Sequence, residues 1–563
     1  MKIPTAPQLA LALICLAVPL TASAISALEF SPASNAESIC IDTPLTITFD
    51  ETPRIGASGV LRVHRADGSI ADSIDLADPS SFRRFIGGAQ SGGVPYAFNY
   101  YPVTISGHTA TVYLHQALAY GETYYVTIEP GVFTDAGGTP FEGISDPETW
   151  RFTTRDAAPP AGSREVTVAA DGAGDFCTVQ GAIDFVPQNN TRRVVITVRR
   201  GTYAEIVYVR SNKPFITLCG EDRDGTLIQY ANNANFNAGN FRVMFGVDAA
   251  DFVLANITLH NTTPRFGSQA EAFRSGSQRV LLNHVNLKSF QDTLLMSGRG
   301  FVNESYIEGD VDFMWGSGAV FFQSCELKAV NPGFYTHVRN PQGMNGNVYV
   351  NCLLSAAPGV TNVYLSRIDP NAFPFSQVIY INCAMGPHIL PVGWQLNNAT
   401  CGQAPNLQFW EYQSMDLNGE PLDVSGRLPC SRQLSDEEAA LWSDPAFVLG
   451  GWVPDLTGPV FESLTASPHV LWPPNHKMRP VTLTALIADD SDPTPQTRII
   501  SVASNEPDEG EPDWEITGDL TLNLRAERAG RGSGRVYTIT VESRDFFCNS
   551  STATVTVIVP HHR

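Results

Sequence analysis

Two aspartates in the middle of the chain are separated by the length of a motif that also repeats around them. Asp292 belongs to the segment Gln291–Leu294, and Asp312 lies 20 residues later (312−292), at the start of Asp312–Gly316. Two carboxylates that lie close together cannot both stay ionised without cost, so one tends to hold a proton while the other stays charged. A charged carboxylate can act as a nucleophile, and a protonated one can act as a general acid. The pair therefore predicts attack on a substrate together with protonation of its leaving group.

Two glutamines accompany the aspartates. Gln291 directly precedes Asp292, and Gln269 lies 22 residues before Gln291 (291−269), close to the same spacing. Side-chain amides can donate hydrogen bonds to an oxyanion that develops at a carbonyl group. No pair of cysteines or histidines here has the spacing of a zinc site. We therefore expect an acid–nucleophile site with no cofactor and no metal.

A repeated motif predicts how these residues are brought together. Two apolar residues followed by an amide recur in steps of 27, 20, 20, 28 and 31 residues, at Asn256, Asn283, Asn303, Gln323, Asn351 and Asn382. A strand that recurs at such a period indicates a solenoid, here a parallel β-helix, in which equivalent residues on successive coils stack. The two aspartates should then lie on adjacent coils, roughly 5 Å apart. The amides should form a hydrogen-bonded ladder.

The cysteines divide into two groups. Of the ten, Cys15 lies in a predicted export signal, and the remaining nine cannot all pair internally. Cys401 and Cys430 flank one loop-rich stretch and are the predicted disulfide. Three others follow amides of the repeat and are predicted to be stacked apolar fillers, not metal ligands: Cys325, Cys352 and Cys383.

Linkers rich in Pro and Gly at 157–164 and 453–459 divide the mature chain into three parts. The β-helix is predicted for 165–452. The flanking parts, 28–156 and 460–563, contain short runs of alternating apolar and polar residues, and each is predicted to be an Ig-like β-sandwich. The fold class is therefore all-β.

Residues 1–27 have the features of an export signal, because Lys2 precedes an apolar run, Leu9–Leu20, and then small residues. No other apolar run has membrane length. The formal net charge of −21 argues against nucleic acid, whose binders need basic patches. We expect a secreted, extracellular bacterial protein that acts as a monomer, with neither nucleic acid nor membrane as a partner.

The segment from about 165 to 450 resembles the pectin methylesterases, whose fold is a right-handed parallel β-helix. Six motifs occur in the family's order: Gly201–Glu205, Gln269–Ala272, Gln291–Leu294, Asp312–Gly316, Leu365–Arg367 and Gly393–Trp394. The resemblance implies a pectinesterase that hydrolyses the C6 methyl esters of homogalacturonan and releases methanol.

The resemblance also implies a role for each catalytic residue. Asp312 attacks the ester carbonyl and forms an acyl-enzyme. Asp292 protonates the departing methanol and then activates the hydrolytic water. Gln269 and Gln291 stabilise the tetrahedral intermediate, and Arg367 holds Asp312 charged and aimed.

The chain departs from the family around the sugar cleft. Asp369 stands where the family usually has a tryptophan, Trp315 replaces a usual Phe, and Phe290 replaces a common Tyr. We predict that these three residues and Trp394 contact the substrate. Trp394 is expected to be a sugar platform, with a core position as the alternative. Asp369 either repels free carboxylates or belongs to a turn that points away from the cleft.

Three other interpretations stay open. Polygalacturonases use several Asp residues and a water, and pectate lyases use Ca²⁺ with a basic residue, but neither needs the two glutamines. A second possibility is an esterase of the same fold that acts on other esters. A third is a non-catalytic wall-binding protein whose Ig-like modules carry the function. The complete set of Asp312, Asp292 and Arg367 favours the pectinesterase.

Overall fold

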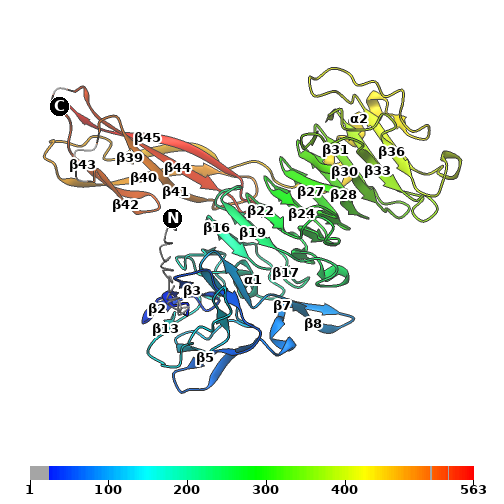
Figure 1. Ribbon diagram of the computed structural model, residues 1–563. Helices are drawn as coiled ribbons and strands as arrows, with labels where there is room; N and C mark the ends of the chain where they lie inside the picture. Colours follow the sequence, from blue (N-terminus) through cyan, green and yellow to red (C-terminus); the bar gives the residue numbers. More distant parts are fainter. Residues whose placement is uncertain (1–23, 508–509, 511, 531, 563) are drawn as a thin grey trace, which may run out of the picture. The chain divides into compact units, whose positions relative to one another are not determined.

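The computed structural model describes residues 24–507, 510, 512–530 and 532–562, which form two compact units (Figure 1). The first unit comprises Pro44–Arg83, Tyr100–Asp156 and the described chain up to Ile39, and the second comprises Cys40–Thr43, Arg84–Asn99 and the chain from Ala157 onward. Residues 1–23 of the predicted export signal lie outside the described residues. Among the described residues, no helix has the length and apolar character needed to cross a membrane.

The first unit is a β-sandwich, as predicted. Residues alternate between buried and half-buried positions along its central strands, so one face of each sheet packs inward. One sheet has the order β1 (Ala27–Ser31), β3 (Leu45–Phe49), β10 (Thr109–Val112), β9 (Val103–Ser106). The other has the order β2 (Ala36–Ile39), β13 (Arg151–Thr154), β11 (Thr123–Ile128), β5 (Val60–Arg65), β6 (Ile70–Asp75).

The second unit is built around the predicted parallel β-helix. Its longest continuous sheet has eleven strands, all parallel to their neighbours. They are β14 (Glu165–Val168), β15 (Val194–Val198), β18 (Ile216–Gly220), β21 (Val253–Ala255), β24 (Val280–Asn283), β27 (Arg299–Asn303), β29 (Ala319–Gln323), β31 (Asn347–Val350), β34 (Gln377–Ile381), β37 (Gln408–Tyr412) and β38 (Arg432–Gln433).

The remaining coil strands form a branched sheet of fourteen strands, whose two series meet at the long strands β28 (Tyr306–Gly316) and β30 (Glu326–Val338). One series before the junction is β16 (Gly201–Ala204), β19 (Thr226–Tyr230), β22 (Thr258–Asn261) and β25 (Asn286–Lys288). The other is β17 (Val207–Val209), β20 (Phe245–Val247), β23 (Phe273–Ser275) and β26 (Leu294–Met296). Beyond the junction lie β32 (Leu353–Ala356), β33 (Tyr364–Ile368), β35 (Ala384–Met385) and β36 (Trp394–Leu396).

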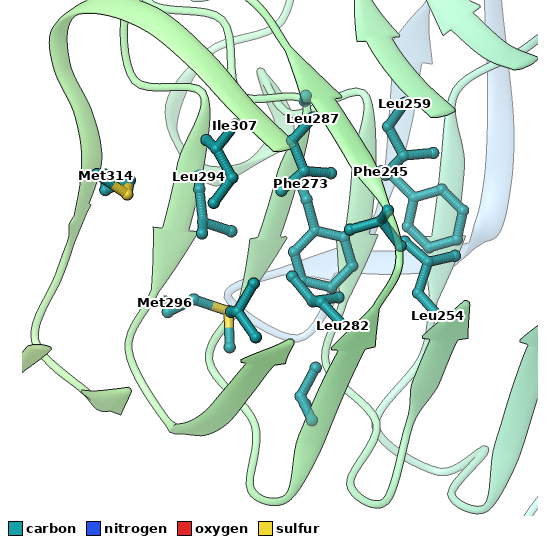
Figure 2. Packing of buried hydrophobic residues seen from close by; sticks show 14 of the residues in the cluster. Phe245, Leu254, Leu259, Phe273, Leu282, Leu287, Leu294, Met296, Ile307 and Met314 are labelled. Carbon is teal, nitrogen blue, oxygen red and sulfur yellow. The ribbon is translucent and has the colours of Figure 1, made fainter. Parts of the chain in front are cut away.

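Like residues stack from coil to coil in the core. Figure 2 shows Phe245 beside Phe273, whose rings are stacked with their centres 5.9 Å apart. Leu294 lies opposite Met314 in the strand register, so the 20-residue step predicted for this pair of coils is confirmed. The predicted steps of 27 and 28 residues are each wrong by one, because Ala255 pairs with Asn283 and Gln323 pairs with Val350.

The amides and cysteines of the repeat are buried or half-buried along the coils, except for Asn351, which is exposed. Asn303 donates a side-chain hydrogen bond to Asn283 over 3.0 Å, which is one rung of the predicted ladder. Three of the amides adopt left-handed backbone conformations where the chain turns: Asn256, Asn351 and Asn382. Cys325, Cys352 and Cys383 are buried free thiols, as predicted.

Further elements complete the second unit. Helix α1 (Val179–Phe185) and the hairpin β7 (Arg83–Ser91)–β8 (Val94–Asn99) contribute Val179, Ile183 and Phe98 to the β-helix core. The helices α2 (Asp436–Trp442) and α3 (Pro445–Val448) pack on residues of the eleven-stranded sheet. The prediction for 28–156 did not separate out this hairpin, because alternation in a strand does not reveal the domain against which the strand packs.

The C-terminal part is a second two-sheet sandwich. One sheet has the order β39 (Val460–Ser467), β40 (Met478–Ala488), β43 (Thr521–Arg525), β42 (Trp514–Gly518), and the other is β41 (Gln496–Ser504), β44 (Gly534–Arg544), β45 (Ser550–Pro560). The predicted disulfide between Cys401 and Cys430 is confirmed. A second disulfide joins Cys219 of β18 to Cys548 in the turn between β44 and β45, and the sequence spacing did not suggest it.

Candidate active site

Asp312 lies in the bend of β28, where the two strand series merge, and its backbone φ is +51°. Its carboxylate is buried and faces the guanidinium of Arg367 on β33. Arg367 donates two parallel hydrogen bonds, from Nε to Oδ1 over 2.9 Å and from Nη2 to Oδ2 over 2.6 Å. Such a two-point contact fixes both the charge and the plane of a carboxylate.

A histidine also reaches this carboxylate. The Nδ1 atom of His337, on β30, lies 3.2 Å from Oδ2 of Asp312. Burial raises the pKa of Asp312, but the hydrogen bonds from His337 and Arg367 and the positive charge of Arg367 outweigh burial, and the pKa lies below its ordinary value. Asp312 is therefore ionised at neutral pH, as a carboxylate nucleophile must be.

Asp292 lies between β25 and β26 and has the opposite electrostatic character. Arg242 donates from Nη2 to Oδ2 of Asp292 over 2.7 Å, and the same guanidinium binds the buried Glu271. Burial and the negative charges of Glu271 and Asp312 outweigh Arg242 and raise the pKa of Asp292 to about 8. Asp292 is therefore mostly protonated at neutral pH and can act as an acid.

The strand register aligns the two aspartates. Leu294 pairs with Met314, so Asp292 and Asp312 occupy equivalent positions two residues earlier on adjacent coils, which lie about 4.8 Å apart. The backbone N–H of Asp292 donates to the carbonyl oxygen of Val311 over 3.2 Å, and Asp292 also has a positive φ, +67°. The sequence prediction of neighbouring carboxylates agrees with this geometry.

Gln291 lies on the same coil as Asp292, and Gln269 lies on the next coil away from Asp312. The N–H of Ala270 donates to the carbonyl oxygen of Gln291 over 3.2 Å, which brings the backbone of Gln269 beside Gln291. Ala272 and Phe273 both donate to the carbonyl oxygen of Thr293, and this bulge explains why the glutamine step is 22 residues while Phe273 pairs with Leu294 at 21.

The glutamine side chains differ in their partners. Within the described part of the chain, the Gln291 side chain makes no hydrogen bond, and that of Gln269 only accepts one, from Ser268 Oγ over 2.9 Å. Their amide N–H groups are therefore able to donate to a bound oxyanion. Gln291 and Phe290 line a cavity of about 90 Å³, which the loop with the 90% exposed Phe266 also borders.

Trp315 lies among the cations of the site. The guanidinium carbons of Arg339 and Arg242 lie 4.9 and 5.5 Å from its ring centre. The Nε1 atom of Trp315 and the Nε atom of Arg339 are buried and have no hydrogen-bond partner among the described residues. The predicted contacts of Trp315 and Phe290 with substrate are compatible with these positions and stay predictions.

The predicted sugar platform at Trp394 is wrong. This side chain is only 1% exposed, and its ring stacks on Phe409 with centres 4.6 Å apart. Tyr380 packs against the same ring at 5.9 Å. Trp394 therefore closes the core of a late coil, which was the alternative interpretation.

Asp369 belongs to a tight turn after β33. Its Oδ1 accepts a hydrogen bond from the N–H of Asn371 over 3.0 Å, and its Oδ2 accepts one from Asn398 over 3.4 Å. These hydrogen bonds lower its pKa. The turn carries Phe373, whose N–H donates to the carbonyl oxygen of Asp369, toward His337. Asp369 thus shapes the loop that places an aromatic ring beside the site, and its contact with substrate stays a prediction.

Three residues at the site were not assigned roles from the sequence: His337, Arg242 and Glu271. Glu271 lies within the motif of Gln269, so it was the residue that the sequence could most easily have placed at the site. Arg242 follows the short 3-10 helix Gly239–Phe241, which the sequence did not predict, and His337 depends on irregular register. The pairing between β28 and β30 shifts twice before Trp315 meets His337, so counting along the repeat does not place this histidine beside Asp312.

Comparisons with known proteins show which families two parts of this chain match. Residues 165–450 match the family model described as Pectinesterase, and residues 21–154 match that described as Bacterial Ig-like domain. The chain is 33% identical over 305 residues to Pectinesterase 31 of Arabidopsis thaliana, covering 51% of this chain and 93% of that protein. It is 30% identical to Pectinesterase QRT1 of the same plant, covering 54% and 83%. Among solved structures, the pectin methylesterase from carrot aligns with a TM-score of 0.48 and 27% identity, covering 52% of this chain and 95% of that one.

Proposed function

Because the chain belongs to the pectinesterase family and is an esterase, we propose that it hydrolyses the C6 methyl esters of homogalacturonan through an acyl-enzyme on Asp312. One observation carries this proposal. Asp312 is held charged by Arg367, while the adjacent Asp292 has a pKa of about 8. Two neighbouring carboxyl groups thus differ in protonation at neutral pH, as a nucleophile and a general acid must.

In the first half of the reaction, a carboxylate oxygen of Asp312 attacks the ester carbonyl carbon. The carbonyl oxygen becomes an oxyanion, which the amide N–H groups of Gln269 and Gln291 stabilise. The intermediate then collapses, the bond to the methoxy oxygen breaks, and the proton of Asp292 goes to that oxygen. Methanol leaves, and the galacturonyl group remains bound to Asp312 as an anhydride.

In the second half, Asp292 is a carboxylate and can accept a proton from water. The resulting hydroxide attacks the acyl carbon, and the bond to Asp312 breaks. The product leaves as galacturonic acid, which releases its proton to solvent, while Asp292 keeps the proton taken from water and Asp312 regains its charge. Arg367 supports both halves, because its two hydrogen bonds stabilise Asp312 as a leaving group and restore its orientation.

The charges around the site suit a pectin substrate. Arg242 binds Asp292, Arg367 binds Asp312, and Arg339 lies beside His337. Each guanidinium can offset negative charge on a neighbouring galacturonate or on the new product. Trp315, Phe290 and the exposed Phe266 supply apolar surface on which sugar rings pack. We further propose that the protein is secreted by a bacterium, since its predicted export signal and Ig-like module fit an enzyme whose polymeric substrate is outside the cell.

The test is methanol release from highly methylated pectin by the purified full chain, with reducing ends and unsaturated products measured in the same samples. We expect the protein to release methanol without forming new reducing ends or unsaturated products. New reducing ends would indicate a polygalacturonase, and unsaturated products would indicate a lyase. Failure to release methanol from pectin, with release of the alcohol from another ester, would assign the site to a different substrate.

Replacing Gln291 by alanine is expected to lower kcat on the order of a hundredfold, since one oxyanion donor is lost. KM should change much less, because the donor acts mainly on charge that develops during attack. The measurement is initial-rate kinetics of methanol release for both proteins. Gln291 is half-buried and makes no side-chain hydrogen bond among the described residues, so the fold should be unaffected. A change confined to KM would contradict the role.

A further inference from the structure

His337 lies between two groups that make opposite demands on one nitrogen atom. Its Nδ1 is 3.2 Å from Oδ2 of Asp312 and 3.1 Å from Nη2 of Arg339. A guanidinium can only donate, so a hydrogen bond from Arg339 requires a lone pair on Nδ1. A carboxylate can only accept, so a hydrogen bond to Asp312 requires a proton on Nδ1. A single nitrogen cannot satisfy both partners at the same time.

The charge of Asp312 decides whether Nδ1 of His337 carries a proton or a lone pair. With the lone pair on Nδ1, two electron-rich atoms, Nδ1 and Oδ2, would face each other at 3.2 Å in a half-buried site, where such repulsion is poorly screened. With the proton on Nδ1, this repulsion becomes a hydrogen bond. Arg339 loses one acceptor in that arrangement but keeps its position over the Trp315 and Phe373 rings. The ionised nucleophile therefore favours Nδ1–H.

We propose that His337 is a positioning residue of the nucleophile, which donates Nδ1–H to Asp312 and makes the reactivity of that carboxylate depend on the protonation of the imidazole ring. This inference rests on the proposed function of Asp312. Arg367 binds both carboxylate oxygens, and His337 adds a third hydrogen bond at Oδ2, so the carboxylate keeps one orientation while the substrate approaches.

Every neighbouring element contributes a charge or a ring to the surroundings of His337. Asp312 belongs to β28, Arg367 to β33, and Arg339 to the segment after β30. Asp292, between β25 and β26, acts on the same cluster from the adjacent coil and is held by Arg242. The Phe373 ring meets the His337 ring edge-on, with centres 6.3 Å apart and an angle of 87°. The imidazole therefore contacts one carboxylate, of Asp312, and one guanidinium, of Arg339, and these two groups belong to a cluster that also includes Arg367.

A second proton on the His337 ring would change the charges around Asp312. An imidazolium still donates to Asp312, but it adds a positive charge beside Arg339 and Arg367, and it draws electron density from the attacking oxygen. Histidine is the side chain that ordinarily changes charge between pH 5 and 8. We therefore expect the rate to fall with acidity in a step that belongs to His337 and is additional to the protonation of Asp312.

Two substitutions separate the effects of position and charge. In His337→Asn, the amide nitrogen can take the place of Nδ1 and donate to Asp312, but it cannot ionise. In His337→Ala, the donor is lost. Because orientation of a reacting group contributes strongly to rate, we expect His337→Ala to lower kcat by about tenfold to a hundredfold with little change in KM. His337→Asn should retain kcat within about threefold of wild type at pH 8.

The discriminating measurement is kcat/KM against pH, from methanol release by the full-length proteins. The wild-type profile should contain one more ionisation on its acid side than that of His337→Asn. Phe373→Leu is the control, since it alters the ring beside His337 and leaves the imidazole, so its profile should keep the additional ionisation. If the wild-type and His337→Asn profiles coincide, or if His337→Ala retains full kcat, the inference is overturned. If wild type releases no methanol at all, the proposed function has failed instead.

Discussion

The Asp312→Asn variant is expected to lose at least about a thousandfold in kcat for methanol release from methylated pectin. The amide matches the carboxylate in shape and can still accept a hydrogen bond from Arg367, so the fold of β28 should be retained. It is a much poorer nucleophile and cannot form the anhydride intermediate. Steady-state kinetics, together with circular dichroism and thermal unfolding of both proteins, provide the measurement.

Asp310→Asn is the matched control for this variant. Asp310 lies two residues away on the same strand, is equally buried at 5% exposure, and likewise binds an arginine, Arg265. It differs in its other partners, because its Oδ1 accepts a hydrogen bond from the backbone N–H of Val311 and its Oδ2 accepts one from Asn331. We expect Asp310→Asn to keep most of the activity. An Asp312→Asn protein with more than about a tenth of wild-type activity would rule out Asp312 as the nucleophile.

The second large effect concerns Asp292. Its pKa of about 8 means that the proton needed by the leaving methoxide is present below pH 8 and is lost as pH rises through this value. We therefore expect kcat to fall on the alkaline side with an apparent pKa near 8. Asp292→Asn removes the proton at every pH and should lower kcat by about a hundredfold to ten-thousandfold.

The choice of ester makes this prediction specific. Methoxide is a poor leaving group and needs the proton, whereas a nitrophenolate does not. On a nitrophenyl ester that the site accepts, the Asp292→Asn variant should therefore show a much smaller defect in the burst that reports acylation. Equal losses for both kinds of ester in that step would exclude Asp292 as the acid. An alkaline limb that persists unchanged in the variant would assign that limb to another group.

The central aspartate pair could be predicted because the coils between residues 283 and 323 have equal lengths. Two successive steps of 20 residues keep Asn283, Asn303 and Gln323 in register, and the same step relates Asp292 to Asp312. On either side, the coils lengthen and the repeat count is wrong by one. A one-residue error in the repeat count still predicts an apolar residue in the core, because neighbouring strand residues are also apolar. The same error would misplace a catalytic side chain.

The residues that were missed or misjudged depend on information that is absent from local spacing. His337 reaches Asp312 only because the pairing of β28 with β30 is irregular. Trp394 was predicted to be a sugar platform, yet Phe409 stacks on its ring and Tyr380 packs against it inside the coil. Cys401 and Cys430 are close in sequence and could be paired by inspection, whereas 329 residues separate Cys219 from Cys548.

The bond between Cys219 and Cys548 also changes the connectivity of the molecule. It closes residues 219–548 into a covalent ring, and this ring contains Gln269, Gln291, Asp292, Asp312 and Arg367. An extracellular protease that cuts one peptide bond in the ring, for example in the exposed loop around Phe266, opens the ring but does not divide the molecule. Both sides of the cut stay attached through the disulfide and through the coils stacked on them. The proposed catalytic groups thus remain parts of one molecule after a single nick, which would suit the proposed secreted enzyme.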